Sequence, residues 1–220
     1  MTKTLTFFHT SPVHIETFDQ LLADLAPDIP AHHVVNEAIL ARAVAAGGLN
    51  TDLAQTAKSL IQEAITPQTG VLLCTCSTIG VPAENANSEV DLPLLRVDKP
   101  MAEEALDIGS RIIVAATVKT TLEPTQQLIL DVAKAKSKEI SLIPLLCADA
   151  WTRFERGDKQ GYLQIVADSL SEIASQGDVI VLAQASMADA VNLAPALPIP
   201  VLSSPRLGLE AAIKAYRRVS

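Results

Sequence analysis

Apolar positions along the chain follow two alternating patterns. Short apolar runs predict strands, and apolar residues three or four positions apart predict helices. In the first half, strands are expected at Leu5–Phe8, His33–Val35 and Val71–Thr75, and helices at His14–Leu25, Glu37–Ala46 and Asp52–Ile65. In the second half, strands are expected at Arg111–Ala115, Ile140–Leu146 and Val179–Ala183, and helices at Glu123–Ala135 and Tyr162–Ser175. Strands that alternate with helices predict an α/β protein with parallel sheets flanked by helices.

The two halves also resemble each other in sequence. Thr10 and Thr117 each end a predicted strand and lie 107 positions apart, and three further pairs share this offset: Glu16/Glu123, Gln20/Gln127 and Leu21/Leu128. Cys76 and Gln184 follow later strands at an offset of 108. An internal duplication explains these matches, and the spacing common to all strand–helix units is the alternative. Duplication predicts two pseudo-symmetric lobes with the active site between them, at the carboxyl ends of the strands.

Composition narrows the functional classes. Of the 220 residues 49% are hydrophobic but only 3% aromatic, so the core must consist of aliphatic side chains, as is typical of buried parallel strands. The formal charge is −8, and basic residues do not form a stripe along the chain. Both features argue against nucleic acid as a partner. No run approaches the ~20 apolar residues of a membrane span, and the first residues do not form a signal peptide. We therefore expect a cytoplasmic protein that acts on a small molecule.

The three cysteines do not have the spacing of a disulfide framework or a zinc site. Cys76 follows a buried strand and precedes a Ser77-Thr78 loop, whose N–H groups could favour the reactive thiolate or hold a carboxylate. The alternative is that Cys76 packs as a small hydrophobic residue, since free cysteine is often buried. We expect packing roles for Cys74 and Cys147.

Hydroxyl groups follow the first strand of each half. His9, Thr10 and Ser11 follow the first strand, and Thr117 and Thr120 occupy the equivalent place in the second half. These side chains could bind a substrate carboxylate. His9 and His14 are secondary candidates for a catalytic base, whereas His32 and His33 are expected to be structural. Because no nucleotide, phosphate-loop or nucleophile-elbow motif occurs, side chains must perform the chemistry.

With these motifs placed, the chain resembles the aspartate/glutamate/hydantoin racemase superfamily. Cys76-Ser77-Thr78 is similar to the Cys-Asn-Thr of that family's first half, and residues 116–120 and 199–202 are similar to its later loop and strand. A register that places Cys74-Thr75 on the motif is the alternative, but it would shorten the strand. The resemblance implies two cysteines, one from each half, that act on opposite faces of the substrate α-carbon. It also implies no metal or organic cofactor, and a homodimer.

The second half departs from this pattern, because Gln184 stands where the family has its second cysteine. A glutamine amide cannot act as a general acid or base near neutral pH, although it can hydrogen-bond to an anion. Ala185 and Ser186 follow it as substrate-binding candidates. A cofactor-independent racemase acting on an amino acid or related small carboxylate through Cys76 is the first expectation. A single-cysteine decarboxylase or lyase, and a catalytically silent metabolite-binding protein, are the alternatives.

The resemblance also predicts where the lobes divide. A helix at 207–216 is expected to return to the first lobe, which would comprise residues 1–98 with 207–220. The second lobe would then comprise residues 99–206.

Overall fold

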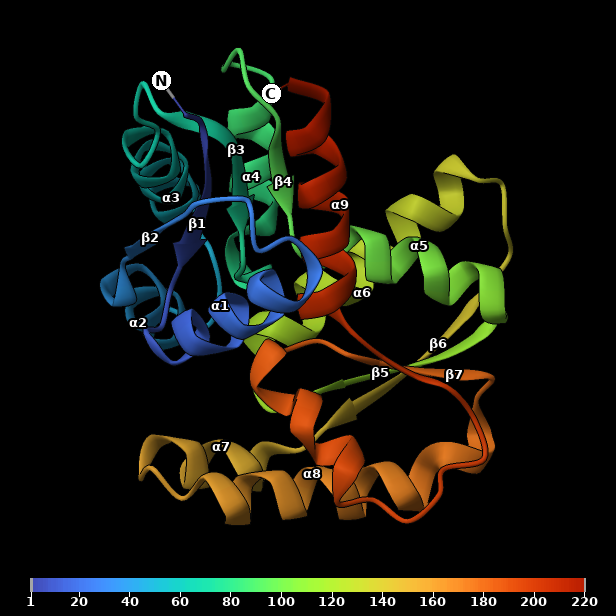
Figure 1. Cartoon of the computed structure of the whole chain (residues 1–220). Coiled ribbons are helices and arrows are strands. Elements are labelled where there is room, and N and C mark those ends of the chain that lie inside the picture. Colours follow the sequence, from blue (N-terminus) through green and yellow to red (C-terminus); the bar gives the residue numbers. More distant parts are fainter. Residues whose placement is uncertain (1, 220) are drawn as a thin grey trace. The chain divides into compact units, whose positions relative to one another are not determined.

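The computed structural model describes residues 2–219 and divides them into two compact units (Figure 1). Unit 1 contains the described residues up to Pro100 and from Pro205 onward, and unit 2 contains Met101–Ser204. The boundaries therefore lie within two residues of positions 98 and 207. Each unit is a four-stranded parallel sheet flanked by helices.

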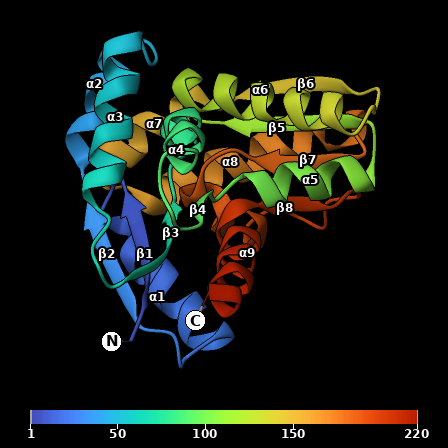
Figure 2. The same cartoon turned by 90° about the horizontal axis from the view of Figure 1, so that it is seen from above.

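Unit 1 is built on the sheet order β2-β1-β3-β4. Its elements are β1 (Thr4–His9), α1 (Val13–Leu25), β2 (Ala31–Val35), α2 (Glu37–Ala45), α3 (Thr51–Glu63), β3 (Thr69–Cys74), the 3-10 turn η1 (Ser77–Ile79), α4 (Gly80–Asn87), β4 (Leu94–Arg96) and α9 (Ser204–Val219). In Figures 1 and 2, α9 lies beside β4, so the C-terminal helix belongs to the first sheet.

Unit 2 has the equivalent sheet order β6-β5-β7-β8. Its elements are α5 (Lys99–Ile108), which begins at the unit boundary, β5 (Arg111–Ala116), α6 (Lys119–Ala135), β6 (Ser141–Leu146), α7 (Ala148–Glu155), α8 (Lys159–Ile173), the 3-10 turns η2 (Ala174–Gln176) and η3 (Ala185–Asn192), β7 (Val179–Leu182) and β8 (Val201–Ser203). In Figure 1, α5 and α6 lie on one side of this sheet and α7 and α8 on the other.

The two sheets also agree in hydrogen bonding at the strand ends. The N–H of Thr75 donates to the carbonyl of Phe8 at 3.0 Å, and the N–H of Ala183 donates to the carbonyl of Ala115 at 2.8 Å. These pairs are related by offsets of 107 and 108 positions, the same offsets that relate the sequence repeats. The sequence repeat is therefore matched by a repeat of strand order and of strand-end geometry.

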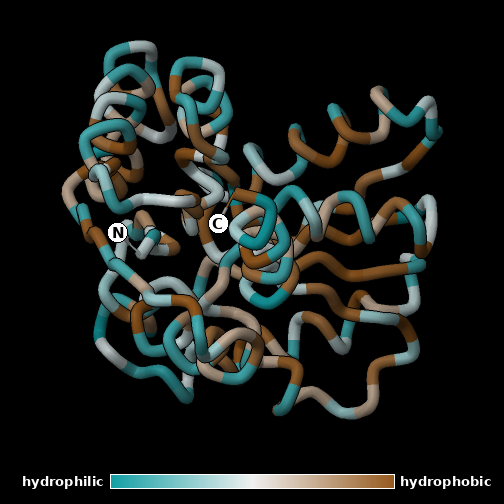
Figure 3. Tube along the Cα trace, turned by 45° about the horizontal axis from the view of Figure 1, so that its top comes forward, coloured by the Kyte–Doolittle hydropathy of each residue, from teal (hydrophilic) through white to brown (hydrophobic). Residues whose placement is uncertain are grey.

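Alternation along β3 explains how the sheet of unit 1 forms two cores. Val71 and Leu73 face α1 and α9, whereas Leu72 and Cys74 face α2, α3 and α4. Successive side chains of a strand point to opposite faces, so a strand covered by helices on both sides must be apolar throughout. Figure 3 shows the result as brown strands among helices whose colour alternates between brown and teal.

Several elements differ from the expectations. Strand β3 ends at Cys74 rather than Thr75, and α6 begins at Lys119, four residues before the predicted Glu123. The first turn of α6 is polar although it is buried, so it carries no hydrophobic periodicity. Helices α4, α5 and α7 and strand β4 were not predicted. α4 contains few large apolar residues, and β4 has three residues, which is too short for a recognisable pattern.

Candidate functional site

Cys76 lies two residues beyond the end of β3. Its backbone is extended (φ −119°, ψ 116°), and its carbonyl accepts the N–H of Ile79 at 3.3 Å to begin the turn η1. The side chain is partly exposed, whereas Cys74 and Cys147 are buried, and none of the three forms a disulfide. Cys76 is therefore the cysteine that an external molecule can reach.

Cys74 has the surroundings of a core residue. It is fully buried, its Sγ lies 3.8 Å from the carbonyl oxygen of Cys76, and burial raises the pKa of its thiol to about 12. The strand was expected to continue up to Cys76, but β3 ends at Cys74, so strand length does not favour Cys76 over Cys74. Exposure, rather than strand length, distinguishes the two cysteines.

Gln184 occupies the equivalent position in unit 2. Its backbone is also extended (φ −125°, ψ 134°) and also precedes a 3-10 turn, η3. Its Oε1 accepts hydrogen bonds from the backbone N–H of Thr117 at 2.6 Å and from the Thr117 hydroxyl at 2.8 Å. Because a backbone N–H can only donate, the amide oxygen must face Thr117. The amide nitrogen of Gln184 therefore points away from Thr117 as a hydrogen-bond donor.

A second contact stabilises the loop that follows Gln184. The hydroxyl of Tyr162 on α8 lies 2.8 Å from the Oγ of Ser186, which is partly exposed, as is Ala185. Burial raises the pKa of Tyr162 to about 12, so its hydroxyl stays protonated. Sequence reasoning missed Tyr162, because no local motif links α8 to η3.

The first turn of α6 carries an unsatisfied hydroxyl. Among the described residues, Thr120 and Thr125 have buried hydroxyls without a hydrogen-bond partner. Val118 precedes the helix without a capping side chain, and its carbonyl accepts the N–H groups of Thr121 and Leu122, so the N–H groups before Thr121 are those without an intrahelical acceptor. Helix N-termini bind anions through such groups and through the helix dipole. This end of α6 has the chemistry of a carboxylate site.

The strand ends of unit 1 bring its predicted residues together, but not all of them are accessible. Ser11 is partly exposed, whereas Thr10, Ser77 and Thr78 are buried. His9 is completely buried and both of its ring nitrogens are in hydrogen bonds. Burial, together with nearby histidines, lowers the pKa of His9 to about 3, so the ring is neutral. In this arrangement His9 contacts the protein interior rather than a ligand.

A buried ion pair lies against Gly80, at the end of the turn that follows Cys76. Arg96 at the end of β4 donates to both carboxylate oxygens of Asp98, at 2.7 and 3.0 Å, and to Glu84 at 3.1 Å. A Cβ added at Gly80, the first residue of α4, would overlap the guanidinium group of Arg96. Sequence reasoning missed this cluster, because Glu84 lies on α4 whereas Arg96 and Asp98 lie at and just after the end of β4.

The predicted residues therefore form two groups, one in each unit. In unit 1 they gather at the carboxyl ends of the adjacent strands β1 and β3: His9, Thr10, Ser11, Cys76, Ser77 and Thr78. In unit 2 they gather at the equivalent ends of β5 and β7: Thr117, Thr120, Gln184, Ala185 and Ser186. Within residues 2–219 no group of three His, Cys, Asp or Glu side chains could hold a metal ion. Over the same range, no helix is long and apolar enough to cross a membrane.

Both units are therefore parallel α/β sheets of the same strand order, with the candidate residues at the carboxyl ends of their two central strands. The chain belongs to the Asp/Glu/Hydantoin racemase family, whose profile matches residues 10–212. No curated protein matches the sequence.

Solved structures share the fold at low sequence identity. Glutamate racemase from Thermus thermophilus, in complex with beta-chloro-D-alanine, is 15% identical with a TM-score of 0.72, and the match covers 98% of this chain and 81% of that one. Aspartate racemase from Picrophilus torridus is 12% identical with a TM-score of 0.66, over 98% and 94% of the two chains. Arylmalonate decarboxylase is 13% identical with a TM-score of 0.54, over 96% and 92%.

Proposed function

We propose that the protein is a cofactor-independent, racemase-type enzyme in which Cys76 transfers a proton at the α-carbon of an amino acid or a related small carboxylate. One observation carries this proposal: in a chain of the racemase family, Cys76 is the partly exposed cysteine and lies at a strand end. A partly exposed thiol can reach a bound molecule, and a positioned cysteine is one of the side chains that perform general acid–base catalysis.

Gln184 supplies hydrogen bonding rather than proton transfer. Its amide oxygen is held by Thr117, so its N–H groups are the part available to a ligand. Such donors stabilise the negative charge that develops on a carboxylate when its α-carbon loses a proton. Thr120, with its unpartnered hydroxyl at the N-terminus of α6, is the carboxylate-binding group that we assign to unit 2.

A one-thiol decarboxylase is the second candidate, and the orientation of Gln184 favours it. Loss of carbon dioxide leaves a carbanion, which needs one proton donor and a hydrogen-bond donor to the oxygen that carries its negative charge. The thiol of Cys76 matches the first need, and the amide N–H groups of Gln184 match the second. The two candidates differ in their products. Incorporation of solvent deuterium at the α-carbon without release of carbon dioxide would support proton exchange, and release of carbon dioxide would support decarboxylation.

Replacement of Cys76 tests the proposal directly. A panel of amino acids, hydantoins and substituted malonates is incubated in D₂O, and deuterium incorporation is followed by mass spectrometry. For the substrate found, Cys76→Ala should lower turnover by about 10²–10⁴-fold, because proton transfer by a positioned side chain contributes that much. The folded state should be unaffected.

Cys74→Ala is the matched control, since Cys74 lies on the same strand end but is fully buried. It should retain turnover. A Cys76→Ala variant with wild-type turnover would refute the assignment. If the whole panel is unreacted and Cys76 alkylates no faster than a free thiol, the protein binds a metabolite without converting it.

A further inference from the structure

Four side chains of unit 1 form a continuous hydrogen-bonded chain from the surface to the end of β3. The half-exposed Asp19 on α1 lies 2.9 Å from His33 Nε2, and His33 Nδ1 lies 2.8 Å from His9 Nε2. His9 Nδ1 lies 2.8 Å from the hydroxyl of Thr75, which donates a hydrogen bond to the carbonyl of Phe8 at 3.1 Å. Nothing in the local sequence around these residues predicts this connection, because they come from four separate elements.

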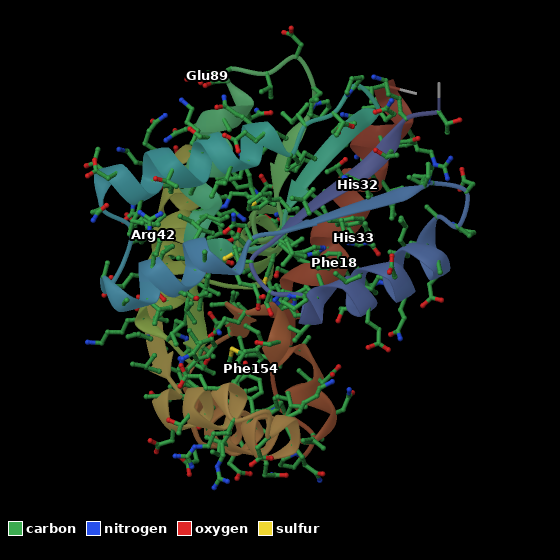
Figure 4. All side chains as sticks on the ribbon, turned by 90° about the vertical axis from the view of Figure 1, so that its left-hand side faces the viewer. Phe18, His32, His33, Arg42, Glu89 and Phe154 are labelled. Atoms are coloured by element: carbon green, nitrogen blue, oxygen red, sulfur yellow. The ribbon has the colours of Figure 1, made fainter. Side chains whose placement is uncertain are left out.

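Aromatic packing holds the two histidine rings of this hydrogen-bonded chain nearly parallel, with 12° between their planes. His33 stacks on Phe7 with ring centroids 4.8 Å apart, and on His9 with centroids 5.1 Å apart. Phe18 of α1 packs against both Phe7 and His9. Figure 4 labels His33 on β2 and Phe18 on α1, near each other. Because the rings are stacked, they cannot easily turn away from their hydrogen-bond partners.

Proton counting allows two arrangements of the chain. In the first, every histidine is neutral: Thr75 donates to His9 Nδ1, and His9 Nε2–H donates to His33 Nδ1. His33 then donates to Asp19 through Nε2–H. In the second, the cluster has gained one proton from water, and His33 carries N–H groups at both positions. His9 now holds its single proton on Nδ1 and donates to Thr75, whose hydroxyl donates to the carbonyl of Phe8 as it does in the structure.

His33 is the member suited to hold the added proton. Its Nε2 lies 2.9 Å from the carboxylate of Asp19, which balances the charge of an added proton. His9 is fully buried, and burial keeps its pKa low, at about 3. The other titratable group that faces His9 is His14 of α1, whose pKa burial also lowers. On the β3 side the chain ends at the uncharged hydroxyl of Thr75.

We propose that His33 is a positioning residue for Cys76, and that its protonation, balanced by Asp19, reverses the hydrogen-bond chain that ends at Thr75. Thr75 immediately precedes Cys76, and its N–H already bonds to Phe8 across β1 and β3. In the second arrangement the Phe8 carbonyl keeps the second hydrogen bond that it accepts from the Thr75 hydroxyl, whereas in the first arrangement that bond is lost. Protonation at the surface thereby changes how the backbone that carries Cys76 is held. This inference rests on the proposed function only where it concerns the role of Cys76.

Nitrogen-15 NMR of the full chain tests the reversal without any substrate. The ring nitrogens of His9 are followed from pH 8 to pH 5, where histidines normally titrate. His9 should change from the Nε2–H to the Nδ1–H tautomer without becoming charged, at the same midpoint at which His33 gains a proton. A His9 ring that keeps one tautomer throughout, or that itself becomes charged in this range, would overturn the proposal.

Asp19→Asn tests the charge balance. Loss of the carboxylate should move the midpoint of the tautomer change to lower pH, because no negative charge then balances the added proton. Glu16→Gln is the matched control, since Glu16 is an exposed carboxylate of the same helix that bonds to Gln20 rather than to His33. It should leave the midpoint unchanged. An equal shift in both variants would mean that the general field of α1, and not Asp19, sets the protonation.

The effect on Cys76 is read from its alkylation rate against pH, with the modified residue identified by mass spectrometry. The rate profile should show an inflection at the His33 midpoint, and Asp19→Asn should move both together. If the tautomer change occurs without the inflection, His33 does not position Cys76. Turnover that survives in Cys76→Ala while the tautomer change persists would refute the proposed function and leave the hydrogen-bond chain intact.

Discussion

At the scale of single residues, surroundings rather than residue type separate the candidates. Cys74 and Cys76 are two positions apart, yet the first is fully buried and the second is partly exposed. From the sequence, His9 was a secondary candidate for a catalytic base and His33 was expected to be structural, yet the structure bonds them to each other at 2.8 Å. A pattern of residue types records neither burial nor partners, and these two quantities control reactivity.

His9 leads to a prediction about stability. Burial lowers its pKa from 6.5 to about 3 in the folded chain, so below pH 6.5 the unfolded chain binds the proton that the folded chain excludes. Stability should therefore fall as the pH falls from 6.5 towards 3. Between pH 7.5 and pH 5 the wild type should lose about 2 kcal/mol more unfolding free energy than His9→Gln. Urea denaturation at the two pH values measures the difference, and equal losses would contradict it.

At the scale of elements, the strand ends determine where the candidate residues lie. The sequence predicted the strands β1, β3, β5 and β7 closely enough to place Cys76 and Gln184 just beyond two of them. It did not predict α4, which follows Cys76 after the turn η1, nor the buried Arg96 that contacts Gly80 at the start of that helix. Short helices of small residues lack hydrophobic periodicity, and the spacing of charged residues in a sequence does not show that an ion pair is buried.

Gly80 tests the role of the Arg96 contact. Its backbone conformation is helical, so any residue could adopt it, and only the guanidinium group of Arg96 excludes a side chain. Gly80→Ala should therefore lower the free energy of unfolding by about 1–3 kcal/mol, the usual cost of overpacking. Chemical denaturation measures this cost. Val81→Ala, at the exposed next position, should stay within about 0.5 kcal/mol of wild type. Equal stability of Gly80→Ala and wild type would mean that Arg96 moves aside freely.

At the scale of the whole molecule, two units with equivalent strand orders carry different residues at equivalent positions. Cys76 and Gln184 share an extended backbone and a following 3-10 turn, so the difference between them is chemical and not conformational. The homodimer and the cytoplasmic location stay predictions.

Gln184→Cys tests the consequence of this asymmetry. With one thiol, proton removal and return occur at the same group, so the wild type should exchange the α-proton of its substrate faster than it inverts the configuration. A second thiol at the equivalent position should raise inversion relative to exchange. Deuterium incorporation and polarimetry on the same sample give the ratio. Gln184→Ser, which adds no proton-transfer group at neutral pH, is the control. Wild-type inversion as fast as exchange would show that another group supplies the second proton.

The sequence by itself determined the α/β class, the repeat and the positions of Cys76 and Gln184, because hydrophobic periodicity and strand spacing are local properties of the chain. Only the tertiary structure decided that Cys74 is buried and that the Gln184 amide nitrogen points away from Thr117. It also decided that one hydrogen-bonded chain joins Asp19, His33, His9 and Thr75. Each of these depends on residues brought together from separate elements. Burial and hydrogen-bond direction arise only when the strands and helices have packed.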